Sequence, residues 1–263
     1  MTRLFHVSDL HFGREDEEAV AWFAATVAKE MPDAVVCTGD LTMRARAREF
    51  AAAGDYLDAL PVPVTVEPGN HDLPYFNPVD RMFRPYRRFG KIEKMVERPI
   101  DLDKVTVVPL RTTARAQWRS NWSWGVVNRT SLEQALALLA KADPSHVKLV
   151  ACHHPLIDKE GLEAEGRTLR GREAVQALAE AGADGVLSGH VHDPFEMFQE
   201  VGDRTIRLIG AGTLSERIRS TPPGFNEIAI GADRTFKVTA RVMRPDHSAA
   251  REPVPVEAPA API

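Results

Sequence analysis

The sequence is poor in cysteine, in long apolar runs and in excess positive charge. Its two cysteines, Cys37 and Cys152, each stand near the end of a short apolar stretch, so we expect buried free thiols and no disulfide. No stretch approaches the ~20 apolar residues that cross a bilayer, and the first residues lack a basic region followed by an apolar one. These absences predict a chain without a membrane span and a cytoplasmic location.

The charge balance argues against nucleic acid as the default partner. With 33 Lys and Arg against 37 Asp and Glu, the formal net charge of -4 supplies no overall basic field to hold a polyanion. A small-molecule substrate is therefore favoured. The 44% hydrophobic content excludes a disordered chain and suffices for a sizeable core in 263 residues.

Short apolar runs alternate with helical patterns along most of the chain. Between the first two runs, Val20, Phe23, Ala24 and Val27 share one face of a predicted amphipathic helix. The predicted strands of this region cover residues 4–7, 34–38, 62–66, 105–110, 147–152 and 185–188. This alternation is typical of a layered α/β domain with largely parallel central strands.

The alternation of strand and helix patterns stops toward the end of the chain. The stretches "TIRLIGAG", "FNEIAIG" and "TFKVTARVM" are strand-like, with turn signals and no helix between them, so we expect antiparallel strands there. Residues 244–263 are rich in Pro and Ala without periodicity, which predicts a flexible tail after a domain of residues 1–243.

Metal-ligand residue types follow five of the apolar runs. They stand in "DLH" (Asp9, His11), "GD" (Asp40), "GNHD" (Asn70, His71, Asp72), "CHHP" (His153, His154) and "GHVH" (His190, His192). Alone, the first motif is also compatible with a helix cap and the last with a polar turn. Because ligands bind at the carboxyl ends of strands in α/β sheets, and imidazole and carboxylate bind divalent ions, the recurrence favours a metal site.

These motifs closely resemble the pattern of the calcineurin-like metallophosphoesterase family, which reads Asp-x-His, Gly-Asp, Gly-Asn-His-Asp/Glu, His and Gly-His-x-His. The match extends over most of residues 5–192, and the "GNHD" and "HHP" forms look most like the bacterial branch related to cyclic nucleotide phosphodiesterases. The protein Ser/Thr phosphatase lineage is disfavoured, because "PGNHD" stands where that lineage has "RGNHE". The resemblance implies a four-layer αββα sandwich.

The resemblance also implies two divalent ions, Mn, Fe, Zn or Co, bridged by Asp40. The first ion would be held by Asp9, His11, Asp40 and His192, and the second by Asp40, Asn70, His153 and His190. A hydroxide shared between the ions would be the nucleophile. His71 would protonate the leaving oxygen or stabilise the transition state, with Asp72 orienting its ring.

The function that these features favour is hydrolysis of small-molecule phosphodiesters, with 3′,5′-cyclic nucleotides among the candidates. The alternatives are a phosphomonoesterase or a sugar-nucleotide pyrophosphate hydrolase. A nuclease is weaker, since nuclease relatives generally add domains or partners. A non-catalytic scaffold conflicts with the full set of seven ligand types. The substrate, the metal and the oligomeric state stay open.

Two segments could contact the substrate, but each has a second interpretation. Residues 74–90 interleave aromatic residues with arginines, which suits either a lid over the substrate or an ordinary helix with aromatic residues inward and arginines in solvent. Residues 111–125 contain Trp118, Trp122 and Trp124 and suit either a cap wall or an oligomer interface.

Overall fold

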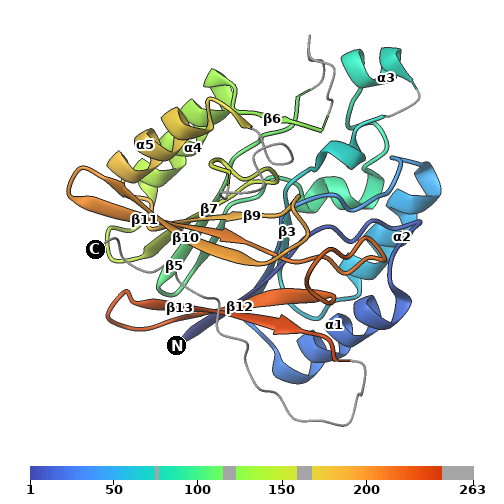
Figure 1. Cartoon of the computed structure of the whole chain (residues 1–263), viewed down its shortest axis with the longest axis horizontal. Coiled ribbons are helices and arrows are strands. Elements are labelled where there is room, and N and C mark those ends of the chain that lie inside the picture. The colour runs from blue at the N-terminus through green and yellow to red at the C-terminus, as the bar shows by residue number, and fades with distance from the viewer. Residues whose placement is uncertain (75–76, 115–122, 159–167, 245–263) are drawn as a thin grey trace.

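Two β-sheets face each other, and helices cover the outer face of each sheet (Figure 1). The computed structural model describes residues 1–74, 77–114, 123–158 and 168–244. The predicted tail lies outside the described residues except for Arg244. Both the alternation of elements and the parallel central strands follow the sequence-based expectation.

The first sheet carries the beginning and the end of the domain. Its order is β13 (Phe236–Val242), β12 (Gly224–Ile230), β1 (Thr2–Val7), β2 (Ala34–Cys37) and β3 (Val64–Val66). Strands β1, β2 and β3 are parallel, and β12 and β13 join them antiparallel, as predicted. Helices α1 (Glu17–Glu30) and α2 (Ala47–Asp58) follow β1 and β2 along the chain.

The second sheet holds the middle of the chain. Its order is β10 (Phe195–Val201), β11 (Arg204–Gly210), β9 (Gly185–Ser188), β7 (Val147–Ala151), β5 (Val105–Pro109) and β4 (Ile100–Leu102). The expectation of purely antiparallel strands from "TIRLIGAG" onward is wrong for β11, which pairs parallel to β9 and antiparallel only to β10. Strand β10, which was not predicted, forms the hairpin that turns β11 back into the parallel direction.

Shorter elements complete the chain. They are the 3₁₀ turns η1 (Asn70–Asp72) and η2 (Gly90–Met95), helices α3 (Pro78–Phe83), α4 (Arg129–Lys141) and α5 (Gly171–Glu180), and the paired strands β6 (Gly125–Val126) and β8 (Thr168–Leu169). Helices α4 and α5 lie over the second sheet on the side away from the first (Figure 1). Among the helices of the described ranges, none combines the length and the apolar character that a membrane-spanning segment needs.

Three hydrophobic layers hold the four structural layers together. Side chains alternate along β1, so Leu4 packs between the two sheets while Phe5 packs toward α1. The Phe5 ring lies 4.8 Å from Phe225 and 6.3 Å from Phe23, centroid to centroid. Leu139 of α4 and Leu178 of α5 pack on the far face of the second sheet. The four-layer αββα sandwich is therefore confirmed. Both cysteines are buried free thiols, as expected.

A buried histidine of β1 should make stability fall in acid. The His6 ring is fully buried, and its Nε2 lies 3.0 Å from Thr38 Oγ1. Burial, opposed by the charge of Asp9, lowers the pKa of His6 from 6.5 to about 3. Between these values the unfolded chain binds one more proton than the folded chain. The free energy of unfolding should therefore drop with falling pH, by at most about 1.4 kcal/mol per pH unit from this group.

Urea unfolding at several pH values between 6.5 and 5, on wild type and His6→Gln with a chelator present, measures this contribution. The wild-type free energy of unfolding should fall more steeply than that of the variant. Parallel pH dependences for the two proteins would show that His6 does not titrate on unfolding.

Candidate metal centre

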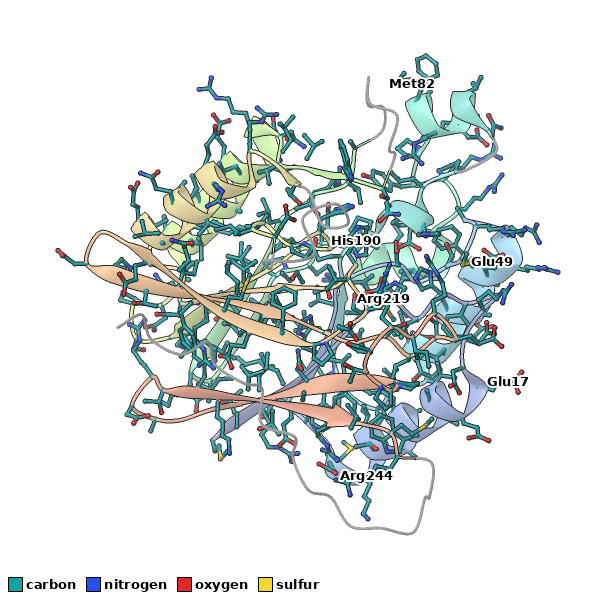
Figure 2. All side chains as sticks on the ribbon, in the orientation of Figure 1. Glu17, Glu49, Met82, His190, Arg219 and Arg244 are labelled. Carbon is teal, nitrogen blue, oxygen red and sulfur yellow. The ribbon has the colours of Figure 1, made fainter. Side chains whose placement is uncertain are left out.

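The seven predicted ligands converge at one edge shared by the two sheets. They follow the carboxyl ends of β1, β2, β3, β7 and β9, which is where the parallel strands direct their loops. Six of the seven are buried, and His190, which is labelled in Figure 2, is partly exposed. The structure thus brings together residues that lie up to 183 positions apart, from Asp9 to His192.

Asp9, His11 and His192 form the first half of the cluster. His11 Nε2 lies 3.2 Å from His192 Nε2 and 3.7 Å from Asp9 Oδ1, and His192 Nε2 lies 3.2 Å from the same carboxylate oxygen. The three ligand-type atoms therefore face a common point and could hold one ion.

His153, Asn70 and His190 form the second half. His153 Nε2 lies 3.1 Å from Asn70 Oδ1, and the His153 and His190 rings are 5.2 Å apart between centroids. Asp40 stands between the halves, with Oδ1 3.5 Å from His153 Nε2 and Oδ2 3.7 Å from His11 Nε2. Each oxygen of this carboxylate faces a different half.

The backbone at this edge is strained in a regular way. Five of the seven predicted ligands have φ between 46° and 72°, namely Asp9, His11, Asp40, His190 and His192. Non-glycine residues seldom adopt this left-handed conformation, although Asp and His do so more readily than most. Such strain persists where the surroundings impose it, and it concentrates at functional sites. Here it turns each side chain inward at the end of its strand.

Glycines let the loops approach one another closely. A Cβ atom at Gly189 would lie 1.7 Å from Ser8 Oγ, and one at Gly69 would lie 2.1 Å from Asp40 Oδ1. Three glycines precede predicted ligands, and Gly39 has a positive φ of 97°. Gly189 does not, and there the positive φ falls on the next residue, His190. Gly69 has a φ of -94°, and no left-handed residue follows it in η1.

Backbone carbonyls set the orientation of the imidazoles. His153 Nδ1 donates to Thr38 O at 2.7 Å, and His192 Nδ1 donates to Arg217 O at 2.6 Å, so Nε2 is the nitrogen of each ring that faces the cluster. His154 differs: its Nδ1 lies 2.9 Å from Thr112 Oγ1, and its Nε2 donates to the Ser123 carbonyl. His154 therefore packs beside the cluster with both nitrogens occupied.

Burial and the attraction between neighbouring charges set the protonation states of the cluster. Burial opposes a charge on Asp40, but the imidazoles of His153 and His71 outweigh it and hold the pKa of Asp40 well below its usual range. Burial also opposes a proton on His153, yet the Asp40 carboxylate raises the pKa of His153 to about 9. Burial lowers the pKa of His11 to about 3, which keeps it neutral. A cation bound by His153 would displace a proton.

The donor set fits a pair of divalent cations. Asp9 Oδ1 and His11 Nδ1 are buried polar atoms without a hydrogen-bond partner among the described residues, although Asp9 Oδ1 is surrounded by imidazole nitrogens. Two buried carboxylates beside several imidazole lone pairs require positive charge between them. Mixed nitrogen and oxygen donors of this kind suit Mn, Fe, Co or Zn.

The two predicted catalytic residues lie in different surroundings. The His71 backbone N–H donates to Asp40 Oδ1 at 2.8 Å, and its ring Nδ1 donates to Met43 O at 2.8 Å. The carboxylate of Asp72 accepts hydrogen bonds from the backbone N–H groups of Leu41, Thr42 and Gly69.

The expectation that Asp72 orients the His71 ring is therefore corrected. The Met43 carbonyl holds the ring, while Asp72, the last residue of η1, is buried and its carboxylate joins the loops after β2 and β3. Burial and the neighbouring Asp40 raise the pKa of Asp72 to about 6, although its backbone hydrogen bonds oppose this.

Sequence reasoning missed Arg217, in the loop between β11 and β12. Its Nη1 lies 3.2 Å from His11 Nε2 and 3.2 Å from His71 Nε2. Arg217 follows the carboxyl end of β11, which lies at the same edge as the carboxyl ends of the other parallel strands. Because the sequence pattern predicts an antiparallel strand there, it does not place the loop after β11 at this edge.

The segment 74–90, predicted as either a lid or an ordinary helix, only partly matches the helix expectation. On α3, Phe83 is 75% exposed and Arg81 is 4% exposed, which is the reverse of aromatic residues inward and arginines in solvent. Farther along, Phe89 is buried and Arg111 stacks on Tyr86, 4.7 Å from the ring centroid. Tyr75, Phe76, Trp118 and Trp122 lie outside the described residues.

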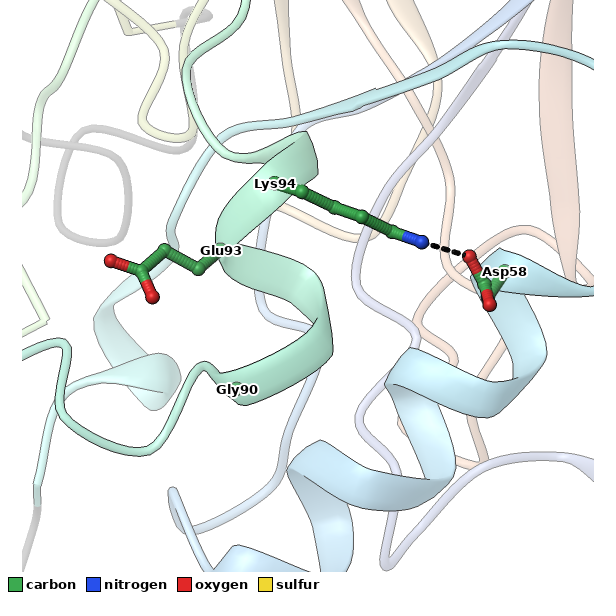
Figure 3. A pocket seen from close by; sticks show the side chains of 4 residues that line it. All are labelled: Asp58, Gly90, Glu93 and Lys94. Carbon is green, nitrogen blue, oxygen red and sulfur yellow. Dashed lines mark hydrogen bonds and ion pairs between the residues drawn. The ribbon is translucent and has the colours of Figure 1, made fainter.

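A surface hollow between α2 and η2 lies apart from the cluster (Figure 3). It has a volume of about 510 Å³ and is lined by Asp58, Gly90, Glu93 and Lys94. Lys94 Nζ is paired with Asp58 Oδ1 at 2.5 Å. Its lining includes no residue of the candidate metal centre.

Comparison with known families and sequences agrees with this geometry. The model of the calcineurin-like phosphoesterase family matches residues 2–194. The chain is 24% identical over 213 residues to a probable cyclic nucleotide phosphodiesterase of Pseudoalteromonas sp. (strain SM9913), covering 76% of this chain and 75% of that protein. It is 32% identical over 92 residues to a glycerophosphodiester phosphodiesterase of Enterobacter lignolyticus (strain SCF1), covering 29% of this chain and 33% of that protein.

Among solved structures, a dimetal phosphatase from Danio rerio has a similar fold. The two chains superpose with a TM-score of 0.60 at 15% identity, covering 86% of this chain and 92% of the other.

Proposed function

This chain belongs to the calcineurin-like phosphoesterase family, and from that premise we propose that it hydrolyses small-molecule phosphodiesters with the aid of two divalent metal ions. The observation that carries the proposal is the convergence of seven ligand-type side chains at one edge of the sandwich, with the Asp40 carboxylate facing both halves. Cyclic nucleotides and glycerophosphodiesters are the leading substrate candidates, since the two related proteins are named for these classes.

Each half of the cluster would hold one ion. Asp9, His11 and His192 would hold the first, Asn70, His153 and His190 the second, and Asp40 both. When bound, the ions would lower the pKa of a water molecule and draw charge from the phosphoryl oxygens. A single shared carboxylate offsets the repulsion of two nearby cations. The neutral amide of Asn70 adds an oxygen ligand without further negative charge that would repel a phosphate.

His71 would act on the leaving group. In the hydrolysis a new P–O bond forms to the oxygen of water, the P–O bond to the leaving group breaks, and the leaving oxygen needs a proton unless it is stable as an anion. The Nδ1 proton of His71 is directed to the Met43 carbonyl, so only Nε2 faces the cluster. A proton carried on Nε2 would pass to the leaving oxygen.

A substrate panel tests the proposed reaction. The reconstituted protein, loaded separately with Mn²⁺, Co²⁺ and Zn²⁺, is assayed with linear and cyclic phosphodiesters, phosphomonoesters and sugar-nucleotide pyrophosphates at matched concentrations. We expect the highest kcat/KM for a small diester. A preference for monoesters or pyrophosphates would replace the diester assignment, and inactivity of the loaded protein on every class would favour a binding scaffold.

A further inference from the structure

Arg217 directs a guanidinium group into the candidate metal centre from a loop that none of the five motifs contains. Its Nη1 lies 3.2 Å from both His11 Nε2 and His71 Nε2, and its side chain is half-buried. It is therefore placed between a predicted metal ligand and the predicted leaving-group residue.

The backbone of Arg217 is tied to the ligand loops. Its carbonyl accepts the Nδ1 proton of His192 at 2.6 Å, and its N–H donates to Ser215 Oγ at 3.3 Å. Thr213 Oγ1, which is 2.7 Å from Ser215 Oγ, donates to Asp9 O at 2.6 Å. The arginine is thus fixed to the first half of the cluster at its backbone, while its long side chain keeps rotational freedom.

Hydrogen bonds also hold the loop of Arg217 on its C-terminal side. Asp193, directly after His192, accepts hydrogen bonds from the N–H groups of Ser220 and Thr221 and from the Ser220 hydroxyl. Both flanks of Arg217 are therefore held, which fixes the point where its side chain enters the site and reduces the backbone entropy lost when it binds a ligand.

One of the two present acceptors of Arg217, His11 Nε2, conflicts with metal binding. An imidazole nitrogen has one lone pair, so His11 Nε2 cannot both accept from Arg217 and coordinate an ion. With ions bound, Arg217 would lose the His11 acceptor and keep only the neutral His71 Nε2, while its positive charge would lie next to cations that repel it. An anion resolves both problems, because it supplies acceptor oxygens and compensates the positive charge.

We propose that Arg217 binds the non-bridging oxygens of the substrate phosphoryl group. The planar guanidinium offers N–H donors in a fork that matches two phosphoryl oxygens. Moving from the imidazoles to the phosphate would also uncover His71 Nε2, the atom that faces the leaving oxygen in the proposed reaction. This inference rests on the proposed function, and it adds a phosphate-binding residue from outside the metal-ligand motifs.

Calorimetric titration of inorganic phosphate into metal-loaded protein tests the proposal without turnover. Arg217→Gln should weaken phosphate binding by roughly tenfold or more, the scale of a lost hydrogen bond to a charged group. Arg217→Lys should fall between wild type and Arg217→Gln, since it keeps the charge but loses the fork. Metal content, measured on the same samples, should equal that of wild type in both variants.

Arg14→Gln is the matched control. Arg14 is exposed and pairs with Glu216 at 3.2 Å, so this variant removes a positive charge from the same region without removing a group that faces the cluster. Its phosphate affinity should stay within about twofold of wild type.

The outcomes separate this inference from the proposed function. Unchanged phosphate affinity in Arg217→Gln, with diester hydrolysis by wild type, would overturn the role of Arg217 alone. Loss of metal in proportion to lost phosphate binding would also overturn it, by making Arg217 a support for the ligands. If loaded wild type neither binds phosphate nor hydrolyses any ester, the proposed function fails, and the role of Arg217 fails with it.

Discussion

Asp40→Asn should bind markedly less metal than wild type and lose nearly all activity. The carboxylate faces both halves of the cluster, at 3.5 Å from His153 Nε2 and 3.7 Å from His11 Nε2. The amide would keep the shape but remove the negative charge that would compensate the two proposed cations. The loss of activity should exceed the roughly 10- to 100-fold that follows removal of an outer hydrogen bond to a metal ligand.

His11→Gln is the comparison, because His11 Nε2 faces only the first half of the cluster. This variant should keep more metal than Asp40→Asn when both are stripped, reconstituted and measured in parallel by elemental analysis. Equal metal content in the two variants would contradict a shared role for Asp40.

His71→Ala should lower kcat by roughly 10²- to 10⁴-fold while metal content stays near wild type. The ring is held by the Met43 carbonyl through Nδ1, and Nε2 is the nitrogen that faces the cluster. Removing it deletes the proposed proton donor without deleting a ligand. Steady-state kinetics and elemental analysis of the same preparation measure the two effects separately.

The nature of the leaving group sharpens this prediction. An activated aryl diester departs without a proton, whereas a simple alkyl diester needs one, so the defect of His71→Ala should be larger for the alkyl ester. Equal slowing of both esters would mean that His71 positions Arg217 or the phosphate and does not protonate the leaving oxygen. Parallel loss of metal and activity would instead make it part of the metal support.

The convergence of the predicted ligands could be anticipated from the sequence because it depends on local patterns. Apolar runs mark the strands, and parallel strands place their carboxyl ends at one edge, so Asp9, Asp40 and His153 were expected to meet before any distance was known. Which strands share a sheet was not contained in those runs, and the division into two facing sheets was implied only by the family resemblance.

The direction of β11 could not be predicted because it depends on a strand that lacks a clear pattern. Strand β10 reads "FEMFQEV", with only Phe195 buried, so the hairpin that reverses the chain was missed. Arg217 was missed as a consequence, since its loop follows β11 at the same edge as the other ligand loops.

The contacts of Asp72 could not be predicted from its position next to His71 in the sequence. Its place next to His71 in sequence suggested a contact between the two side chains, but in the 3₁₀ turn η1 the carboxylate turns to the backbone N–H groups of Leu41, Thr42 and Gly69. A buried carboxylate takes whichever donors the fold supplies, and two of these three, Leu41 and Thr42, come from a loop some 30 residues away.

Counting the divalent ions held by the wild-type chain tests the central claim most directly. Protein stripped by a chelator is reconstituted with Mn²⁺, and bound metal is measured per chain by native mass spectrometry alongside phosphodiesterase activity. We predict two ions per chain at saturation, with activity that follows metal content. A chain that binds no ion after reconstitution, or that hydrolyses diesters fully with none bound, would contradict the two-metal account.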